Sequence, residues 1–144
     1  MKLQTDDYSC GPIALINAYI YLHGKYPRIS TRTLAIECLT TENGTNRWDL
    51  DNNSILILKK PTYNIKKIME MNAFILLYSF SKSNAHYIFV KKVDNENFHI
   101  YNYYDTENDS YMNIVMDQES FLHKILRKNP RISNLDYPLA WTIN

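Results

Sequence analysis

The feature that most constrains the fold of this chain is its apolar segment at residues 10–23 (CGPIALINAYIYLH). Pro12 falls in the first turn of the expected helix, where its missing N–H would have no partner. Gly24 and Pro27 follow the segment and end it. Apolar residues lie on nearly every face of such a helix, which is typical of a helix buried at the centre of a domain. We therefore expect a buried central helix that begins at Cys10.

The hydrophobic pattern changes after this helix. Ser30 or Thr31 is expected to cap a second helix near residues 31–39, and residues 40–54 read as a polar loop with one helical turn around Trp48. β-Branched and aromatic runs predict strands in the second half, at residues 74–80, 86–93, 97–104 and 137–143. Short helices are expected at residues 64–71 and 118–129. Helices first and antiparallel strands afterwards favour an α+β fold with segregated layers.

Length and composition narrow the classes of protein. The 144 residues fit a single domain, residues 1–144, and the hydrophobic share of 45% is enough for one core. The net charge of +1 argues against a nucleic-acid partner or a charged membrane surface. No signal peptide is evident, and no apolar run reaches the ~20 residues of a membrane helix. We expect an intracellular protein with no membrane partner.

The cysteines and histidines show no spacing typical of a metal site, so neither a metal nor a cofactor is expected. Cys10 and Cys38 are expected to be free thiols, with a Cys10–Cys38 disulfide as the alternative. Cys38 lies among apolar residues late in the second predicted helix and is interpreted as a core residue.

Cys10 stands where the central helix begins. Unpaired N–H groups and the positive end of the helix dipole favour an anion there, and they lower the pKa of a thiol. The thiolate is the nucleophilic form, so this position suits covalent catalysis. The alternative is that Cys10 is a small buried hydrophobic residue.

The residues around Cys10 favour catalysis. The stretch from Gln4 to Pro12 (QTDDYSCGP), followed by a helix with small residues and an asparagine, resembles the N-terminal signature of the C39-like branch of papain-fold cysteine peptidases. The resemblance implies a papain-like fold, with N-terminal helices packed on a C-terminal antiparallel sheet. It also implies an oxyanion hole formed by the Gln4 side-chain amide and the Cys10 N–H. Without it, Gln4 would be interpreted as a solvated residue.

The expected catalytic base is His86, which starts a strand after the polar turn 81–85 and could project into a cleft. The family places its histidine at such a point, before aromatic and β-branched residues, and the run from Ala85 to Val90 (AHYIFV) looks like that pattern. The other histidines are interpreted as structural or solvated: His23, His99 and His123.

Asn102 and Asp105 are the candidates for the residue that orients His86. A three-residue hairpin loop at 94–96 would place residue 102 opposite residue 88, on the same face as His86, whereas a two-residue loop would place Asp105 opposite His86. The interval in the family favours Asn102. The family often has glycine near this turn and an Asp-Pro pair after the second strand, and this chain has neither.

The predicted function is a hydrolase that cleaves a peptide or isopeptide bond through Cys10, His86, Asn102 and Gln4. Its expected partner is a peptide or protein, such as a leader peptide, a ubiquitin-like tail or a glutamine side chain. Family members that cleave leaders are often fused to transporters, and this chain is expected to stand alone. The alternative is a catalytically inactive papain-fold module that binds a peptide or partner protein.

Overall fold

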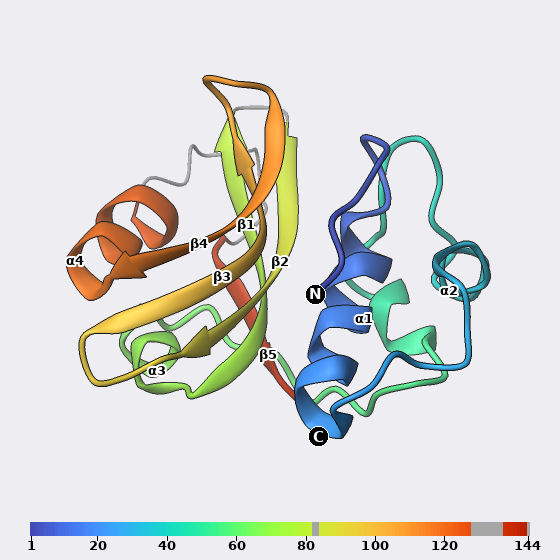
Figure 1. Ribbon diagram of the computed structural model, residues 1–144, viewed down its shortest axis with the longest axis horizontal. Coiled ribbons are helices and arrows are strands. Elements are labelled where there is room, and N and C mark those ends of the chain that lie inside the picture. Colours follow the sequence, from blue (N-terminus) through green and yellow to red (C-terminus); the bar gives the residue numbers. More distant parts are fainter. Residues whose placement is uncertain (82–83, 128–136, 144) are drawn as a thin grey trace.

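The computed structural model describes residues 1–81, 84–127 and 137–143, and it places helices on both faces of one antiparallel sheet (Figure 1). The sheet has five strands in the order β4-β3-β2-β1-β5. In chain order they are β1 Ala73–Ser81, β2 Asn84–Lys92, β3 Asn97–Asp105, β4 Ser110–Asp117 and β5 Leu139–Thr142. The helices are α1 Cys10–His23, α2 Thr31–Glu37, α3 Ile65–Glu70 and α4 Gln118–Phe121, with short turns at Asp49–Asn52 and Leu122–Leu126.

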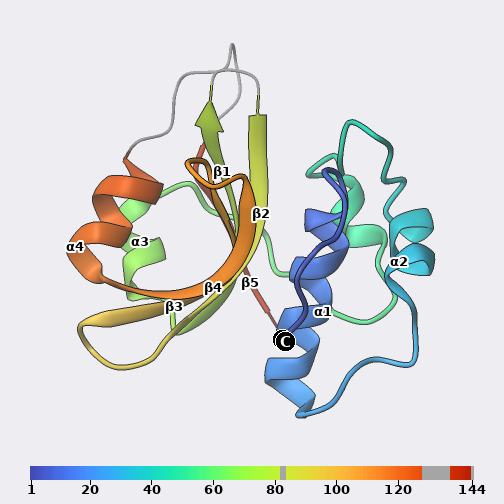
Figure 2. The same cartoon turned by 45° about the horizontal axis from the view of Figure 1, so that its top comes forward.

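Each face of the sheet carries its own hydrophobic cluster. Figure 2 shows α1 and α2 on one side of the sheet and α3 and α4 on the other. The α1 cluster joins Ala14 and Leu15 to alternate strand residues, among them Ile75, Leu77, Tyr87, Phe89 and Trp141. The cluster on the opposite face joins Phe121 and Ile125 to the intervening residues of the same strands, among them Phe74, Leu76, Ile88 and Val90. This alternation is what a sheet covered on both faces requires.

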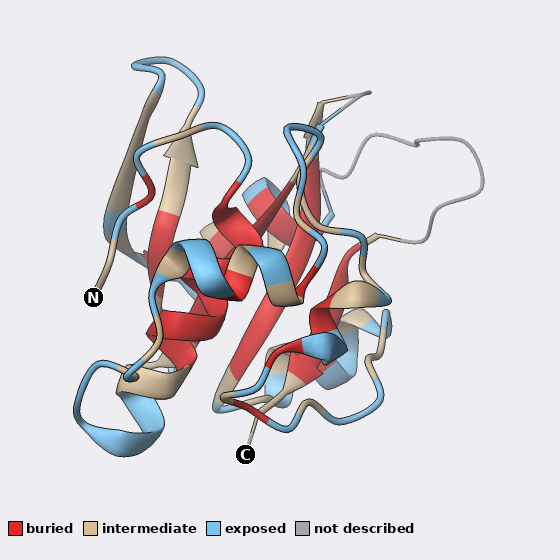
Figure 3. Ribbon diagram, turned by 90° about the vertical axis from the view of Figure 1, so that its right-hand side faces the viewer, coloured by how far each residue is buried: buried red, intermediate tan, exposed pale blue. Residues whose placement is uncertain are grey.

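The central helix is confirmed. α1 is buried from Cys10 to Ala18, and its last turns reach the surface (Figure 3). Gly24 ends it with a left-handed φ of 70°, where its N–H donates to the Ile20 carbonyl at 2.8 Å. Because α1 packs against β1, β2 and β3, its first residue, Cys10, lies in the same buried cluster as Leu77 and Tyr87.

Most predicted elements are found near their expected bounds. Ser30 caps α2 by accepting from the Thr33 N–H, and Trp48 precedes the turn Asp49–Asn52. Asn64 caps α3 in the same way. The last helix begins at Gln118 as expected, and its predicted end near residue 129 lies outside the described residues. No helix in the described ranges is long and apolar enough to cross a membrane.

β4 is not among the strands that the sequence predicts. Its apolar residues Met112, Ile114 and Met116 do alternate, but Asn113 interrupts the run and most of its side chains are at least partly exposed. β4 is an edge strand, and pairing with β3 supplies the stabilisation that its own sequence signals only weakly.

The hairpin between β2 and β3 closes with a three-residue loop. Lys92 pairs with Phe98 and Phe89 pairs with Tyr101, and the Val93 N–H donates to the Asn97 carbonyl at 3.0 Å. Continuing this register sets residue 102 opposite residue 88, as the three-residue alternative predicts. The ladder does not continue regularly, because Asn102 has a positive φ of 66° and the pairing of β3 with β4 shifts between Ile100 and Tyr103.

Candidate active site

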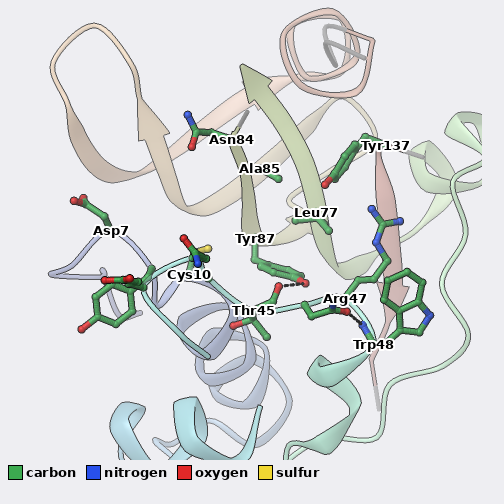
Figure 4. A pocket seen from close by; sticks show the side chains of 15 residues that line it. Asp7, Cys10, Thr45, Arg47, Trp48, Leu77, Asn84, Ala85, Tyr87 and Tyr137 are labelled. Atoms are coloured by element: carbon green, nitrogen blue, oxygen red, sulfur yellow. Dashed lines mark hydrogen bonds between the residues drawn. The ribbon is translucent and has the colours of Figure 1, made fainter. Parts of the chain in front are cut away.

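Cys10 is the first residue of α1 and lines a cavity of about 490 Å³ (Figure 4). The turn before it is held by Asp6, whose carboxylate accepts hydrogen bonds from the N–H groups of Tyr8 and Ser9 at 3.0 and 2.8 Å. Tyr87, one residue after His86, lines the same cavity. The helix start and β2 therefore meet at this cavity.

One wall of the cavity is the segment 42–48. The Tyr87 hydroxyl donates to the Thr45 carbonyl at 3.0 Å and so ties this wall to β2. The Arg47 guanidinium lies 5.6 Å from the Trp48 ring centroid and 5.1 Å from that of Tyr137. Trp48 is 70% exposed, so its indole forms part of the surface rather than the core. Of these wall residues, only Trp48 stands out in the sequence of the loop; Thr45 and Arg47 do not.

The expected lowering of the Cys10 pKa is wrong for this structure. Burial raises the pKa of the Cys10 thiol from 9.0 to about 11, and the backbone N–H groups of Tyr87 and Gly11 oppose this rise only in part. Desolvation of the thiolate therefore outweighs the favourable field of the helix start. In this geometry Cys10 is a neutral thiol.

His86 lies in β2 and is almost fully buried. Its Nε2 lies 2.6 Å from the backbone carbonyl oxygen of Asn102. Aromatic rings surround the imidazole, with centroids 5.7 to 6.4 Å away, from Tyr78, Phe80, Tyr104 and Tyr111. Burial lowers the pKa of His86 from 6.5 to about 4, although the Asn102 carbonyl opposes this.

The Asn102 contact fixes the tautomer of His86. A carbonyl oxygen can only accept, so Nε2 carries the proton and Nδ1 of the neutral ring carries the lone pair. Among the described residues, no hydrogen bond joins His86 to Cys10. Such bonds are often absent from a free enzyme and form when substrate binds.

The side chain of Asn102 contacts Gln4, not His86. Its Oδ1 accepts from the Gln4 N–H at 3.0 Å, and its Nδ2 donates to Gln4 Oε1 at 2.7 Å. Gln4 Nε2 in turn donates to the Asp6 carbonyl at 2.7 Å. Gln4 is buried, which excludes the alternative of a solvated residue. The structure brings Gln4, Asn102 and His86 into one hydrogen-bonded chain.

Asp105 has a different place. It ends β3, where its carboxylate accepts from the Glu107 N–H at 3.1 Å and the Asn108 side chain at 2.6 Å. These contacts stabilise the turn to β4.

Cys38 is fully buried, with Sγ 3.9 Å from the Leu50 carbonyl, and both cysteines are free thiols. The core interpretation of Cys38 is confirmed, and the disulfide alternative is not found. In the described part of the chain, no cluster of three or more His, Cys, Asp or Glu residues could hold a metal ion.

Two solved structures, a peptidase domain and a protease, share the fold of this chain. The chain has the papain-like fold of these peptidase domains. One is the peptidase domain of Streptococcus ComA, a bifunctional ABC transporter of a quorum-sensing pathway: 98% of this chain aligns with 94% of that domain at a TM-score of 0.67 and 17% identity.

The other is a double-glycine motif protease from an AMS/PCAT transporter in complex with its leader peptide. It aligns over 99% of this chain and 89% of its own, with a TM-score of 0.66 and 14% identity. At such identities the likeness establishes the fold, which is the α+β papain-like fold that the Gln4–Pro12 motif implied. No family model and no curated protein matches the chain.

Proposed function

We propose that this chain is a cysteine peptidase whose nucleophile is Cys10 and whose general base is His86. The observation that carries the proposal is the position of Cys10, which is the first residue of a buried helix and lines a cavity beside β2. The fold shared with two peptidase domains supports it. So does the hydrogen-bonded chain of Gln4, Asn102 and His86.

The pKa values favour a neutral resting pair. Burial raises the pKa of the Cys10 thiol to about 11 and lowers that of the His86 imidazole to about 4, and both shifts favour the neutral groups over a thiolate–imidazolium pair. Proton transfer is then coupled to attack. As Sγ bonds to the substrate carbonyl carbon, its proton moves to Nδ1 of His86, and the Nε2–H remains on the Asn102 carbonyl.

The oxyanion that forms is stabilised by two N–H groups. Gln4 Nε2 uses one hydrogen for Asp6 and has a second to donate. The Cys10 N–H belongs to the first residue of α1 and has no partner within the helix. The imidazolium of His86 then protonates the leaving amine. Water, deprotonated by neutral His86, releases the acyl group and restores the thiol.

The proposed substrate is a peptide whose cleaved bond follows small residues. The AMS/PCAT protease bears the name of a double-glycine motif and was solved with a leader peptide. In this chain the wall at Thr45 lies so close to α1 that a Cβ on Gly11 would stand 2.7 Å from Thr45 Oγ1. This closeness beside Cys10 favours small side chains next to the cleaved bond. A ubiquitin-like tail ending in glycines is the alternative.

The test uses a peptide ending in Gly-Gly joined to aminomethylcoumarin, the same peptide ending in Leu-Leu, and a ubiquitin-like tail with the same fluorophore. We expect the wild type and Cys38→Ala to release coumarin from a Gly-Gly substrate, and Cys10→Ala to release none. Release by Cys10→Ala, or by no variant including the wild type, would contradict the peptidase proposal. Binding without cleavage would instead identify the inactive peptide-binding module.

A further inference from the structure

The N-terminal segment that carries Gln4 is held by a pair of fully buried asparagines, one on each side. From α1, Asn17 accepts the Lys2 N–H at 2.7 Å and donates to the Lys2 carbonyl at 3.0 Å. From β3, the Asn102 amide accepts the Gln4 backbone N–H at 3.0 Å and donates to the Gln4 side-chain Oε1 at 2.7 Å. Each amide therefore satisfies a donor and an acceptor of the segment.

The backbone conformation of Asn102 allows its carbonyl and its side chain to contact different residues. Its φ of 66° is left-handed, a conformation that Asn and Gly adopt more readily than other residues. Its N–H donates to Asn113 Oδ1 at 2.9 Å, which fixes the bulge from β4. In this conformation its carbonyl contacts His86 while its side chain contacts Gln4.

We propose that Asn102 is a positioning residue with two separate tasks: its carbonyl orients His86, and its side-chain amide, together with Asn17, places Gln4 for the oxyanion. This inference rests on the proposed peptidase function. It differs from a triad in which a side chain orients the histidine, because the atom of Asn102 that contacts His86 is the backbone carbonyl oxygen, and both polar atoms of its side chain contact Gln4. The side chain links the base to the oxyanion donor.

Substitutions can separate the two tasks. Asn102→Gly tolerates the positive φ, keeps the carbonyl and removes the amide. Asn102→Asp keeps an acceptor for the Gln4 N–H but cannot donate to Oε1, so it draws the Gln4 amide out of place. Asn17→Ala loosens the same segment from α1 and leaves the contact of Asn102 with His86 untouched.

On the Gly-Gly aminomethylcoumarin peptide, we expect Gln4→Ala, Asn102→Gly and Asn102→Asp each to lower kcat by about 10²–10³-fold, as for loss of one oxyanion donor. Asn17→Ala should lower kcat to a smaller degree. The kcat of the double variant Gln4→Ala/Asn102→Gly should be no more than about threefold below that of Gln4→Ala, because both substitutions remove the same oxyanion donor. In Asn102→Gly and Asn17→Ala, which introduce no charge, the acid limb of kcat/KM, which reports His86, should not move.

Other outcomes overturn the proposal. They are a shifted acid limb in Asn102→Gly, losses that multiply in the double variant, or full activity in Asn102→Asp. The first would assign the Asn102 side chain to His86, and the other two would show that it does not place Gln4.

NMR separates this inference from the peptidase proposal. In the wild type the Gln4 side-chain amide protons should exchange slowly, and Asn102→Gly and Asn17→Ala should speed the exchange without changing the His86 ring titration. A wild type that cleaves no peptide overturns the peptidase function. If neither substitution changes the exchange rate of the Gln4 side-chain amide protons, the positioning role is overturned, whatever the activity. Asn17→Ala keeps the test valid if Asn102→Gly does not fold.

Discussion

The backbone carbonyl of Asn102 lies 2.6 Å from Nε2 of His86, and it fixes the proton of the neutral ring on that nitrogen. A backbone group cannot be removed by a side-chain substitution. The tautomer of His86 is thus built into the bulge of β3 and the positive φ of Asn102. This leaves the Asn102 side chain for Gln4, so one residue serves both halves of the candidate site.

The buried neutral His86 makes the protein less stable in acid. The pKa of His86 falls from 6.5 to about 4 on folding, so the folded state binds this proton less readily than the unfolded chain. The contribution of neutral His86 to the free energy of unfolding is fully present above pH 6.5 and is lost as the pH falls toward 4. The whole loss is about 3 kcal/mol. Urea unfolding across this range measures it. His86→Gln, which can still donate to the Asn102 carbonyl, should remove this part of the pH dependence. An equally steep loss in His86→Gln would contradict the assignment.

Cys10 should react with iodoacetamide as a buried thiol in the free protein. Its pKa of about 11 predicts that labelling rises continuously with pH from neutral into the alkaline range, with no plateau in acid. Cys38 has a similar pKa, also about 11, but is fully buried, so Cys10, which lines the cavity, should be labelled first. Mass spectrometry of Cys10→Ser and Cys38→Ser proteins distinguishes the sites. A labelling rate that is independent of pH would show that the thiol is already ionised.

Gly11→Ala should destabilise the protein because its Cβ would stand 2.7 Å from Thr45 Oγ1 and 3.0 Å from Thr45 Cβ. Overpacking of this kind costs about 1–3 kcal/mol, and it should also displace the wall of the cavity. Thr45→Gly removes both atoms, so the double variant Gly11→Ala/Thr45→Gly should cost no more than Thr45→Gly alone. Urea denaturation of the four proteins forms a complete cycle. Additive losses would show that the two residues do not meet.

Trp48→Ala should change substrate binding and leave folding almost unchanged. The side chain is 70% exposed, and exposed substitutions usually alter stability by less than about 0.5 kcal/mol. Because Trp48 lines the cavity that contains Cys10, the variant should raise KM for the Gly-Gly peptide with little change in kcat. Trp141→Phe is the matched control, since Trp141 is buried in the α1 cluster and its loss should lower stability. An unchanged KM in Trp48→Ala would place the peptide elsewhere.

Much of the fold was predictable because its signals are local. The apolar run of α1, with Pro12 in its first turn and Gly24 after its end, specifies a buried helix without reference to any other segment. The alternating and aromatic runs of β1 to β3 do the same for strands. β4 was missed because an edge strand with few buried side chains depends on its neighbour.

The sequence by itself determined which residues could act: a cysteine at a helix start, a glutamine six residues before it, and a histidine followed by strand residues. The tertiary structure decided how they are charged and joined. Burial set the pKa values of Cys10 and His86, because desolvation depends on everything packed around a group. The hairpin loop and the bulge set the two contacts of Asn102, because a positive φ turns the carbonyl and the side chain toward different partners.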